Sequence, residues 1–147
     1  GFDLAVNFPY LPQQEPILVN LAILELTVCY LDGASSNPFG PPAQLEIYTY
    51  EDDRLILIDD VVFALGSGVF GLENYFGGIP LKATNAETTY RFNLSAQVQK
   101  IILGEASPTV YVRVRQRESN AHQTFICGAS AGDRAPKLTI TYSRLNQ

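Results

Sequence analysis

Histidine, cysteine, tryptophan and methionine are scarce or missing in this sequence, which limits the chemistry that it can carry. There is one histidine, His122, and there are two cysteines, while Trp and Met do not occur. No Cys-x-x-Cys pair, His-Glu-x-x-His pair or phosphate-binding glycine loop is present. A zinc site has no ligand set here, and we expect no enzyme activity, no catalytic residue and no cofactor beyond the calcium considered below.

Charge is also sparse, and its balance is acidic. Charged residues make up 17% of the chain, and the net charge is −5. Nucleic acids and anionic membrane surfaces attract basic proteins, so we expect neither as a partner. No apolar run reaches the length of a membrane span, so we expect no membrane insertion by this segment. A length of 147 residues predicts a single domain, residues 1–147, that can bury a core of its own.

The two cysteines, Cys29 and Cys127, lie far apart in the sequence. A bond between them would close a long loop and stabilise the fold by restricting the unfolded chain. Such a disulfide would indicate an oxidising compartment, either outside the cell or at its surface. Two buried free thiols are the alternative, and the sequence leaves both interpretations open.

Alternating apolar and polar residues recur along the chain with the period of half-buried strands. Ala22, Leu24, Leu26 and Val28 share one parity, for example, and turn-forming residues separate the segments that alternate in this way. This pattern predicts an all-β fold, an antiparallel two-sheet β-sandwich of jelly-roll type with one short helix. The predicted strands cover residues 1–8, 17–31, 44–50, 54–58, 88–92, 109–116, 123–127 and 137–142.

The helix is predicted over Leu94–Leu103, directly after a strand. Asn93 or Ser95 can cap its start, and Gly104 can end it in the left-handed conformation. Leu94, Val98, Ile101 and Ile102 fall on one helical face, and Gln97, Gln99 and Lys100 are expected to point away. The glycine-rich segment 61–80 is interpreted as a long ordered loop with at most one short strand, of the kind that often carries a binding site.

Aromatic and arginine side chains are the candidate ligand-binding residues. Tyr and Phe rings can stack on the apolar faces of sugars or pack beneath the long loop. Arginines that repeat at period two can face an anionic partner or pair with Glu25 or Glu46 on a neighbouring strand. The candidates are Tyr48, Tyr50, Tyr75, Phe76, Arg113 and Arg115.

Acidic residues gather at two expected turns. Asp52, Asp53 and Asp59 supply oxygen ligands of the type that Ca²⁺ prefers, so they are the candidates for a structural calcium site. Solvated turn residues are the alternative interpretation, because no spaced acidic loop motif accompanies them.

The N-terminal segment has one strongly apolar face, formed by Phe2, Leu4, Val6 and Phe8. That face must be covered, and the Pro-containing stretch that follows is semi-rigid. The segment can return to its own sheet as an edge strand. It can also add a strand to a neighbouring subunit, which would build a filament.

Three stretches resemble a known group of proteins. They are 22–28 followed by Leu45-Glu46-Ile47-Tyr48, then Tyr90-Arg91-Phe92-Asn93-Leu94 leading into a short helix, and Pro136-Lys137-Leu138-Thr139-Ile140-Thr141-Tyr142 at the close. This order resembles a family of uncharacterised cell-surface lipoprotein domains of Bacteroidetes-type bacteria. It is also similar to disaggregatase-related carbohydrate-binding modules. The resemblance implies a jelly-roll sandwich outside the cell and carries no catalytic residue.

These observations favour a non-catalytic extracellular module with a structural or adhesive role at the cell surface. Self-association, as a subunit of a filament or other surface assembly, and contact with another cell-surface protein are the expected partnerships. A carbohydrate-binding module that takes a polysaccharide is the alternative, because the aromatic loop and the resemblance both suit it.

Overall fold

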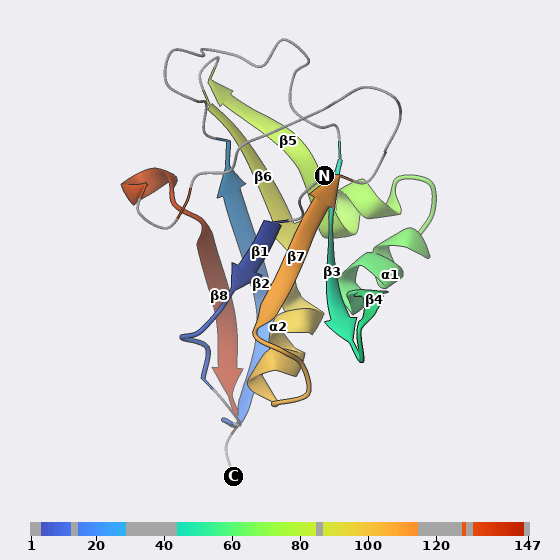
Figure 1. Cartoon of the computed structure of the whole chain (residues 1–147), viewed down its shortest axis with the longest axis vertical. Helices are drawn as coiled ribbons and strands as arrows, with labels where there is room; N and C mark the ends of the chain where they lie inside the picture. The colour runs from blue at the N-terminus through green and yellow to red at the C-terminus, as the bar shows by residue number, and fades with distance from the viewer. Residues whose placement is uncertain are drawn as a thin grey trace.

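The computed structural model describes residues 4–12, 15–28, 44–84, 87–114, 128 and 131–145. Eight strands of this part of the chain form two antiparallel four-stranded sheets (Figure 1). The front sheet has the order β1-β7-β3-β4 and the back sheet has the order β5-β6-β2-β8. The strands are β1 (Leu4–Asn7), β2 (Ile17–Thr27), β3 (Leu45–Glu51), β4 (Arg54–Leu57), β5 (Gly77–Thr84), β6 (Glu87–Asn93), β7 (Thr109–Val114) and β8 (Lys137–Arg144).

The predicted two-sheet sandwich is therefore confirmed. The chain passes repeatedly from one sheet to the other, as in a jelly roll, and the inward residues of both sheets form one core. The predicted strand at 123–127 lies outside the described residues. One short strand was allowed in the segment 61–80, but the position and length of β5 were not predicted, because its Gly-Gly-Ile-Pro start lacks the alternation that marks a strand.

Strand β2 changes the parity of its inward residues once. Ile17 is buried and Val19 packs against the core, while Ala22 and Leu24 are also buried although they have the opposite parity. The register of β2 against β8 shifts between Val19 and Leu21. This β-bulge absorbs one extra residue, so the apolar residues on both sides of it face the core.

The chain has more helix than the sequence predicted. Helix α2 (Ser95–Ile102) matches the expected one, but a second helix, α1 (Asp59–Leu65), and a π-helical turn, η1 (Leu72–Phe76), occupy half of the segment 61–80 that was interpreted as a loop. A short 3-10 helix, η2 (Gly132–Arg134), precedes β8. None of the helices in the described ranges is long and apolar enough to span a lipid bilayer.

The N-terminal strand lies in its home position, at the edge of the front sheet beside β7. Leu4 and Val6 pair in register with Val112 and Val110, on the inward face. Phe8 is buried, and its backbone N–H donates to the carbonyl of Pro108 at 2.7 Å. Phe2 lies outside the described residues.

Helix α2 takes the place of a strand along the first half of β2. Strand β6 pairs with β2 only from Ile23 to Thr27. In the part of β2 that precedes Ile23, Ser95 Oγ accepts from the N–H of Ala22 at 3.0 Å, and the Gln99 amide accepts from the N–H of Val19 at 2.8 Å. The same amide donates to the carbonyl of Ile17 at 3.1 Å. A side-chain amide with one donor and one acceptor thus imitates the peptide group of a neighbouring strand.

Two expectations about α2 are corrected and two are confirmed. Gln97 is buried and Gln99 bonds to β2, so neither side chain points away from the fold. The apolar face is buried as predicted, and Gly104 has a φ of 77°. The Gly104 N–H donates to the carbonyl of Ile101, and the Glu105 N–H donates to that of Lys100. These two bonds form a Schellman motif, which ends the helix.

Removal of the Gln99 amide should destabilise the protein even though Leu fills similar space. In Gln99→Leu the Val19 N–H and the Ile17 carbonyl lose their partners, and we expect a loss of about 1–3 kcal/mol in the free energy of unfolding. Urea unfolding measures this loss. Glu105→Leu, at an exposed position just past the same helix, should change stability by less than about 0.5 kcal/mol. Equal stability of the two variants would contradict the role assigned to Gln99.

Candidate functional site

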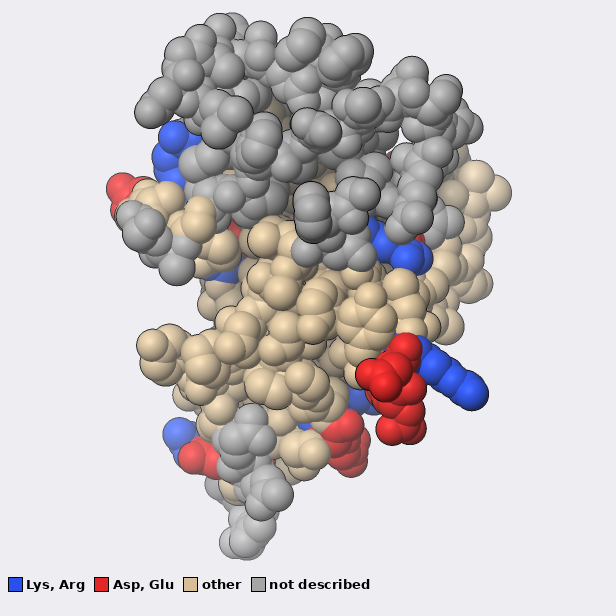
Figure 2. All heavy atoms as spheres, in the orientation of Figure 1, with Lys and Arg blue, Asp and Glu red and all other residues tan. Residues whose placement is uncertain are grey.

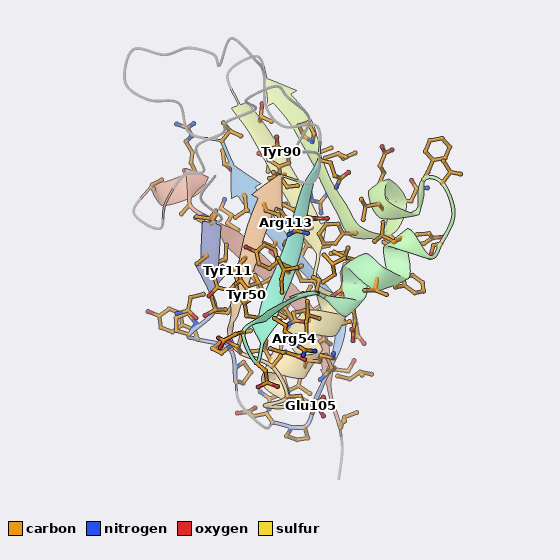
Figure 3. All side chains as sticks on the ribbon, turned by 45° about the vertical axis from the view of Figure 1, so that its right-hand side comes forward. Tyr50, Arg54, Tyr90, Glu105, Tyr111 and Arg113 are labelled. Carbon is orange, nitrogen blue, oxygen red and sulfur yellow. The ribbon has the colours of Figure 1, made fainter. Side chains whose placement is uncertain are left out.

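The sequence-predicted aromatic residues fall in two separate places. Tyr48, Tyr50 and Arg113 come together with Tyr111 on the outer face of the front sheet, as Figure 3 shows for the last three. Tyr75 and Phe76 lie instead in η1, on the segment that connects the two sheets. Arg115 lies outside the described residues.

The tyrosine cluster consists of Tyr48, Tyr50 and Tyr111. The Tyr48 and Tyr111 rings are stacked with centroids 5.6 Å apart, and the Tyr50 ring meets both edge-on, at 5.5 Å and 5.1 Å. Such edge and offset contacts between rings are favourable. Tyr48 has no exposed surface, although its parity places it on the outer face, whereas Tyr50 is 46% exposed. Tyr50 is thus the member of the cluster most accessible to a ligand.

Arg113 is held from two sides. It is the register partner of Glu46 on β3 and forms a salt bridge with it, and Glu46 is itself buried. The Arg113 guanidinium also lies 5.0 Å from the centre of the Tyr48 ring. The cross-strand interpretation of Arg113 is therefore confirmed. A buried carboxylate accounts for its charge, and Glu25 pairs instead with Arg91.

The neighbours Tyr75 and Phe76 have opposite environments. Phe76 is buried against Phe92 in the core, with ring centroids 5.6 Å apart, so packing and not ligand stacking explains it. Tyr75 is half exposed and meets Phe63 of α1 edge-on at 5.7 Å. The structure therefore adds Phe63 to the exposed aromatic residues, a position that the sequence analysis placed in a loop.

An apolar patch surrounds Phe63 and Tyr75. Helix α1 buries Val61 and Ala64, but its outward positions also carry apolar side chains where a surface helix normally has polar ones. The loop after the helix adds two more, of which Val69 is 94% exposed. We define the apolar patch as the exposed residues Val62, Phe63, Leu65, Val69, Phe70 and Tyr75.

The apolar patch is free of charge. No Asp, Glu, Lys or Arg occurs between Val61 and Leu72, and the only hydroxyl in that run, on Ser67, donates to the carbonyl of Phe63 at 2.8 Å. In Figure 2 the part of the right-hand margin at the height of α1 in Figure 1 is tan, and acidic and basic side chains appear below it. This charge-free run was the signal in the sequence that could have identified the patch.

Two features fix the position of the apolar patch: a close backbone contact at Gly71 and the side chain of Asp60. A Cβ atom on Gly71 would lie 2.1 Å from the carbonyl oxygen of Ala64, so only glycine lets the turn before η1 approach α1 so closely. Asp60 of α1 accepts from the N–H groups of Ala96 and Gln97, both at 3.0 Å. Asp60 therefore caps the start of α2 although it belongs to a different helix. Of the backbone N–H groups at that start, Asn93 accepts from the first one, that of Ser95.

Burial raises the pKa of the Asp60 carboxyl above its ordinary value, although the bonds from Ala96 and Gln97 oppose that shift. The neighbouring acid, Asp59, makes a 2.9 Å salt bridge with Lys100, and this bond raises the pKa of the lysine. Both acids thus connect α1 to α2, one through the backbone and the other through a side chain at the surface.

The candidate calcium ligands do not gather in one place. Asp52 and Asp53 form the turn between β3 and β4, and both have positive φ, as a two-residue type I′ hairpin turn requires. Asp59 belongs to α1 and pairs with Lys100. Within the described ranges no group of three His, Cys, Asp or Glu residues is placed to hold a metal ion, and calcium binding stays a prediction. Cys29 and Cys127 lie outside those ranges, so the disulfide also stays a prediction.

A Gly-x-Ser-x-Gly sequence, the pattern of a hydrolase nucleophile elbow, occurs once, from Gly128 to Gly132. In such an elbow the serine sits between a strand and a full helix. Here the segment leads into the three-residue 3-10 helix η2, and Ser130 and His122 lie outside the described residues. The pattern alone therefore assigns no nucleophile.

Comparisons with known proteins identify no relative. No family model, no curated protein and no solved structure matches the chain. The tyrosine cluster and the apolar patch are therefore the two surfaces of the described residues from which a function is proposed.

Replacement of Asp60 should change how stability depends on pH. The folded protein keeps the Asp60 proton to a higher pH than the unfolded chain, in which the carboxyl pKa is 3.8. The contribution of Asp60 to the free energy of unfolding therefore falls as pH rises from that value through the folded pKa. Because Asn does not titrate, the stability advantage of the wild type over Asp60→Asn should shrink across this window.

Urea unfolding of both proteins at a series of acidic and neutral pH values measures this difference. Asp59→Asn is the matched control, because Asp59 accepts no bond from the start of α2, and it should not reproduce the decline. A wild-type advantage over Asp60→Asn that grows with pH would contradict the predicted direction.

Proposed function

We propose that the chain is a non-catalytic extracellular module with a structural or adhesive role at the cell surface, and that it makes its contacts through the apolar patch. The observation that carries the proposal is the size and neutrality of that patch. Its six residues expose on the order of 600 Å², at the upper end of what a typical monomer leaves uncovered. The largest apolar patch on a monomer is often a functional surface.

The chemistry of the patch favours a protein partner over a sugar. Sugar hydroxyls need hydrogen-bonding groups when they leave water. Five of the six patch residues lie in the run from Val61 to Leu72, which has no charged side chain and whose one hydroxyl is already bonded to the backbone. The phenol of Tyr75 is the one polar group on the six patch side chains. An apolar protein surface needs no such groups and is therefore the better match.

The resemblance to surface lipoprotein domains supports the extracellular location. The position of β1 supports an assembly role, since β1 pairs with β7 at a sheet edge and a strand from another subunit can make the same pairing. Exchange of residues 1–8 between subunits remains one form that such an assembly can take.

The location and the contact surface can be tested together on native cells. An antibody should label the protein on intact cells, without permeabilisation. In cells that lack the gene, wild-type protein should restore adhesion or surface structure, whereas Val69→Asp should reach the surface at normal levels and fail to do so. Tyr10→Asp, at another nearly fully exposed position, is the matched control and should act as wild type.

Labelling only after permeabilisation would contradict the extracellular role. Full activity of Val69→Asp at normal surface levels would contradict the role of the patch.

A carbohydrate-binding module is the second candidate, and the tyrosine cluster is the observation that favours it. There an exposed ring, Tyr50, lies beside polar and charged groups, which is the combination that sugars require. A glycan array at high protein concentration should then show saturable binding that Tyr50→Ala abolishes. Tyr142→Ala removes a ring of equal exposure, 48% against 46%, from a strand of the other sheet and is the control. Binding that survives Tyr50→Ala would exclude the cluster.

A further inference from the structure

We propose that the apolar patch is the contact surface of a two-fold symmetric dimer, in which its partner is the same patch on a second copy of this chain. The inference rests on the proposed function, because it names the partner for the same surface. Charge, area and the way the patch is mounted on the fold each support it.

The charge distribution makes this patch a suitable place for two copies to meet. Each chain carries a net charge of −5, so most surfaces of one copy repel the same surfaces of another. The patch has no charge between Val61 and Leu72. Of the acids beside it, Asp59 is paired with Lys100, and Asp60 is bonded to the start of α2. Among the described residues, the exposed acid Glu73 is the one left to be accommodated at the rim of the dimer contact.

Two other exposed apolar side chains, Leu18 and Leu21, lie on the outer face of the back sheet, which also carries the ion pair between Arg91 and Glu25. A second copy that docked there would have to desolvate those ions. The patch on α1 and η1 imposes no such cost.

The area is also close to what a dimer needs. A standard protein interface buries about 800 Å² on each partner, and the six patch residues expose on the order of 600 Å². The exposed glycines and Ser67 between α1 and Val69 add to this area at the rim. In a two-fold dimer one contact covers the apolar patches of both copies at once.

The patch is mounted rigidly enough to act as an interface. Val61, Ala64 and Phe76 are core residues on its inner side, and Asp60 holds α1 against α2. The Phe63 and Tyr75 rings contact each other across the two helical segments. These two rings are therefore held in place before association, which lowers the entropic cost of ordering them.

Sedimentation analysis of the full chain over a wide concentration range tests the proposal. The wild type should pass from one chain to two and stop there, because a two-fold contact closes. Added salt should leave the dimer unchanged or strengthen it, since it screens the repulsion between the two acidic chains. Val69→Asp should weaken association by about 100-fold or more, because it buries two unpaired carboxylates.

The controls keep the result independent of folding. Val69 and Tyr10 are 94% and 97% exposed, so neither Val69→Asp nor Tyr10→Asp should alter the circular dichroism spectrum. Tyr10→Asp should dimerise as wild type does. Phe70→Asp is a second patch variant and should be monomeric at concentrations where the wild type is a dimer.

Three results would overturn the inference: a wild type that stays monomeric at all concentrations, a mass that continues to grow beyond two chains, or a dimer that Val69→Asp and Phe70→Asp leave intact. A monomeric wild type whose Val69→Asp variant still fails on cells would place another protein on the patch. The proposed function would then survive while the dimer would not. If the protein is found only inside cells but forms a dimer through the patch, the dimer would stand and the proposed extracellular function would not.

Discussion

The backbone hydrogen bonds of β2 are the constraint on which the rest of the structure depends. Strand β2 is the longest in the described part of the chain and lies between β6 and β8, but β6 covers only its second half. Buried N–H and C=O groups need partners, and without them each costs about 1–3 kcal/mol. Helix α2 supplies these partners through Ser95 and Gln99, so the strand remains satisfied on both sides.

This arrangement determines where α1 and the apolar patch lie. A helix that starts inside the fold has N–H groups that water does not reach, and two of those in α2 are satisfied by Asp60. Asp60 therefore brings α1 against α2, with Val61 and Ala64 in the core and Val62 and Phe63 on the outside. The exposed patch is thus the outer side of a helix whose inner side is required for the fold.

The features that depend only on residues close together in the sequence were predicted. The parity of Ala22 to Val28, the buried face of α2 and the end of that helix at Gly104 all follow from spacing and from glycine conformation, and all are confirmed. The pairing of Arg113 with Glu46 was predicted as one of two choices, because cross-strand register decides between them. The period-two arginines also left open a role in binding an anionic partner, which the register alone could not be used to judge from the sequence.

The features that were missed depend on distant contacts or on broken patterns. Helix α1 was missed because apolar residues at Val62, Phe63 and Leu65 remove its amphipathic signal. Gln97 and Gln99 were expected outside, since nothing in their sequence neighbourhood reveals the unpaired half of β2. The cap from Asp60 joins residues 36 positions apart, and neighbours such as Tyr75 and Phe76 differ only in which side of η1 meets the core.

The central feature of this fold is that α2 takes the place of a strand beside β2. Amide hydrogen exchange, followed residue by residue by NMR, tests that claim most directly. If Gln99 and Ser95 are the partners of Val19 and Ala22, both amides should exchange only through global unfolding, like those at the centre of the sheet. Fast exchange of Val19 and Ala22, at the rate of an uncovered edge strand, would contradict the account.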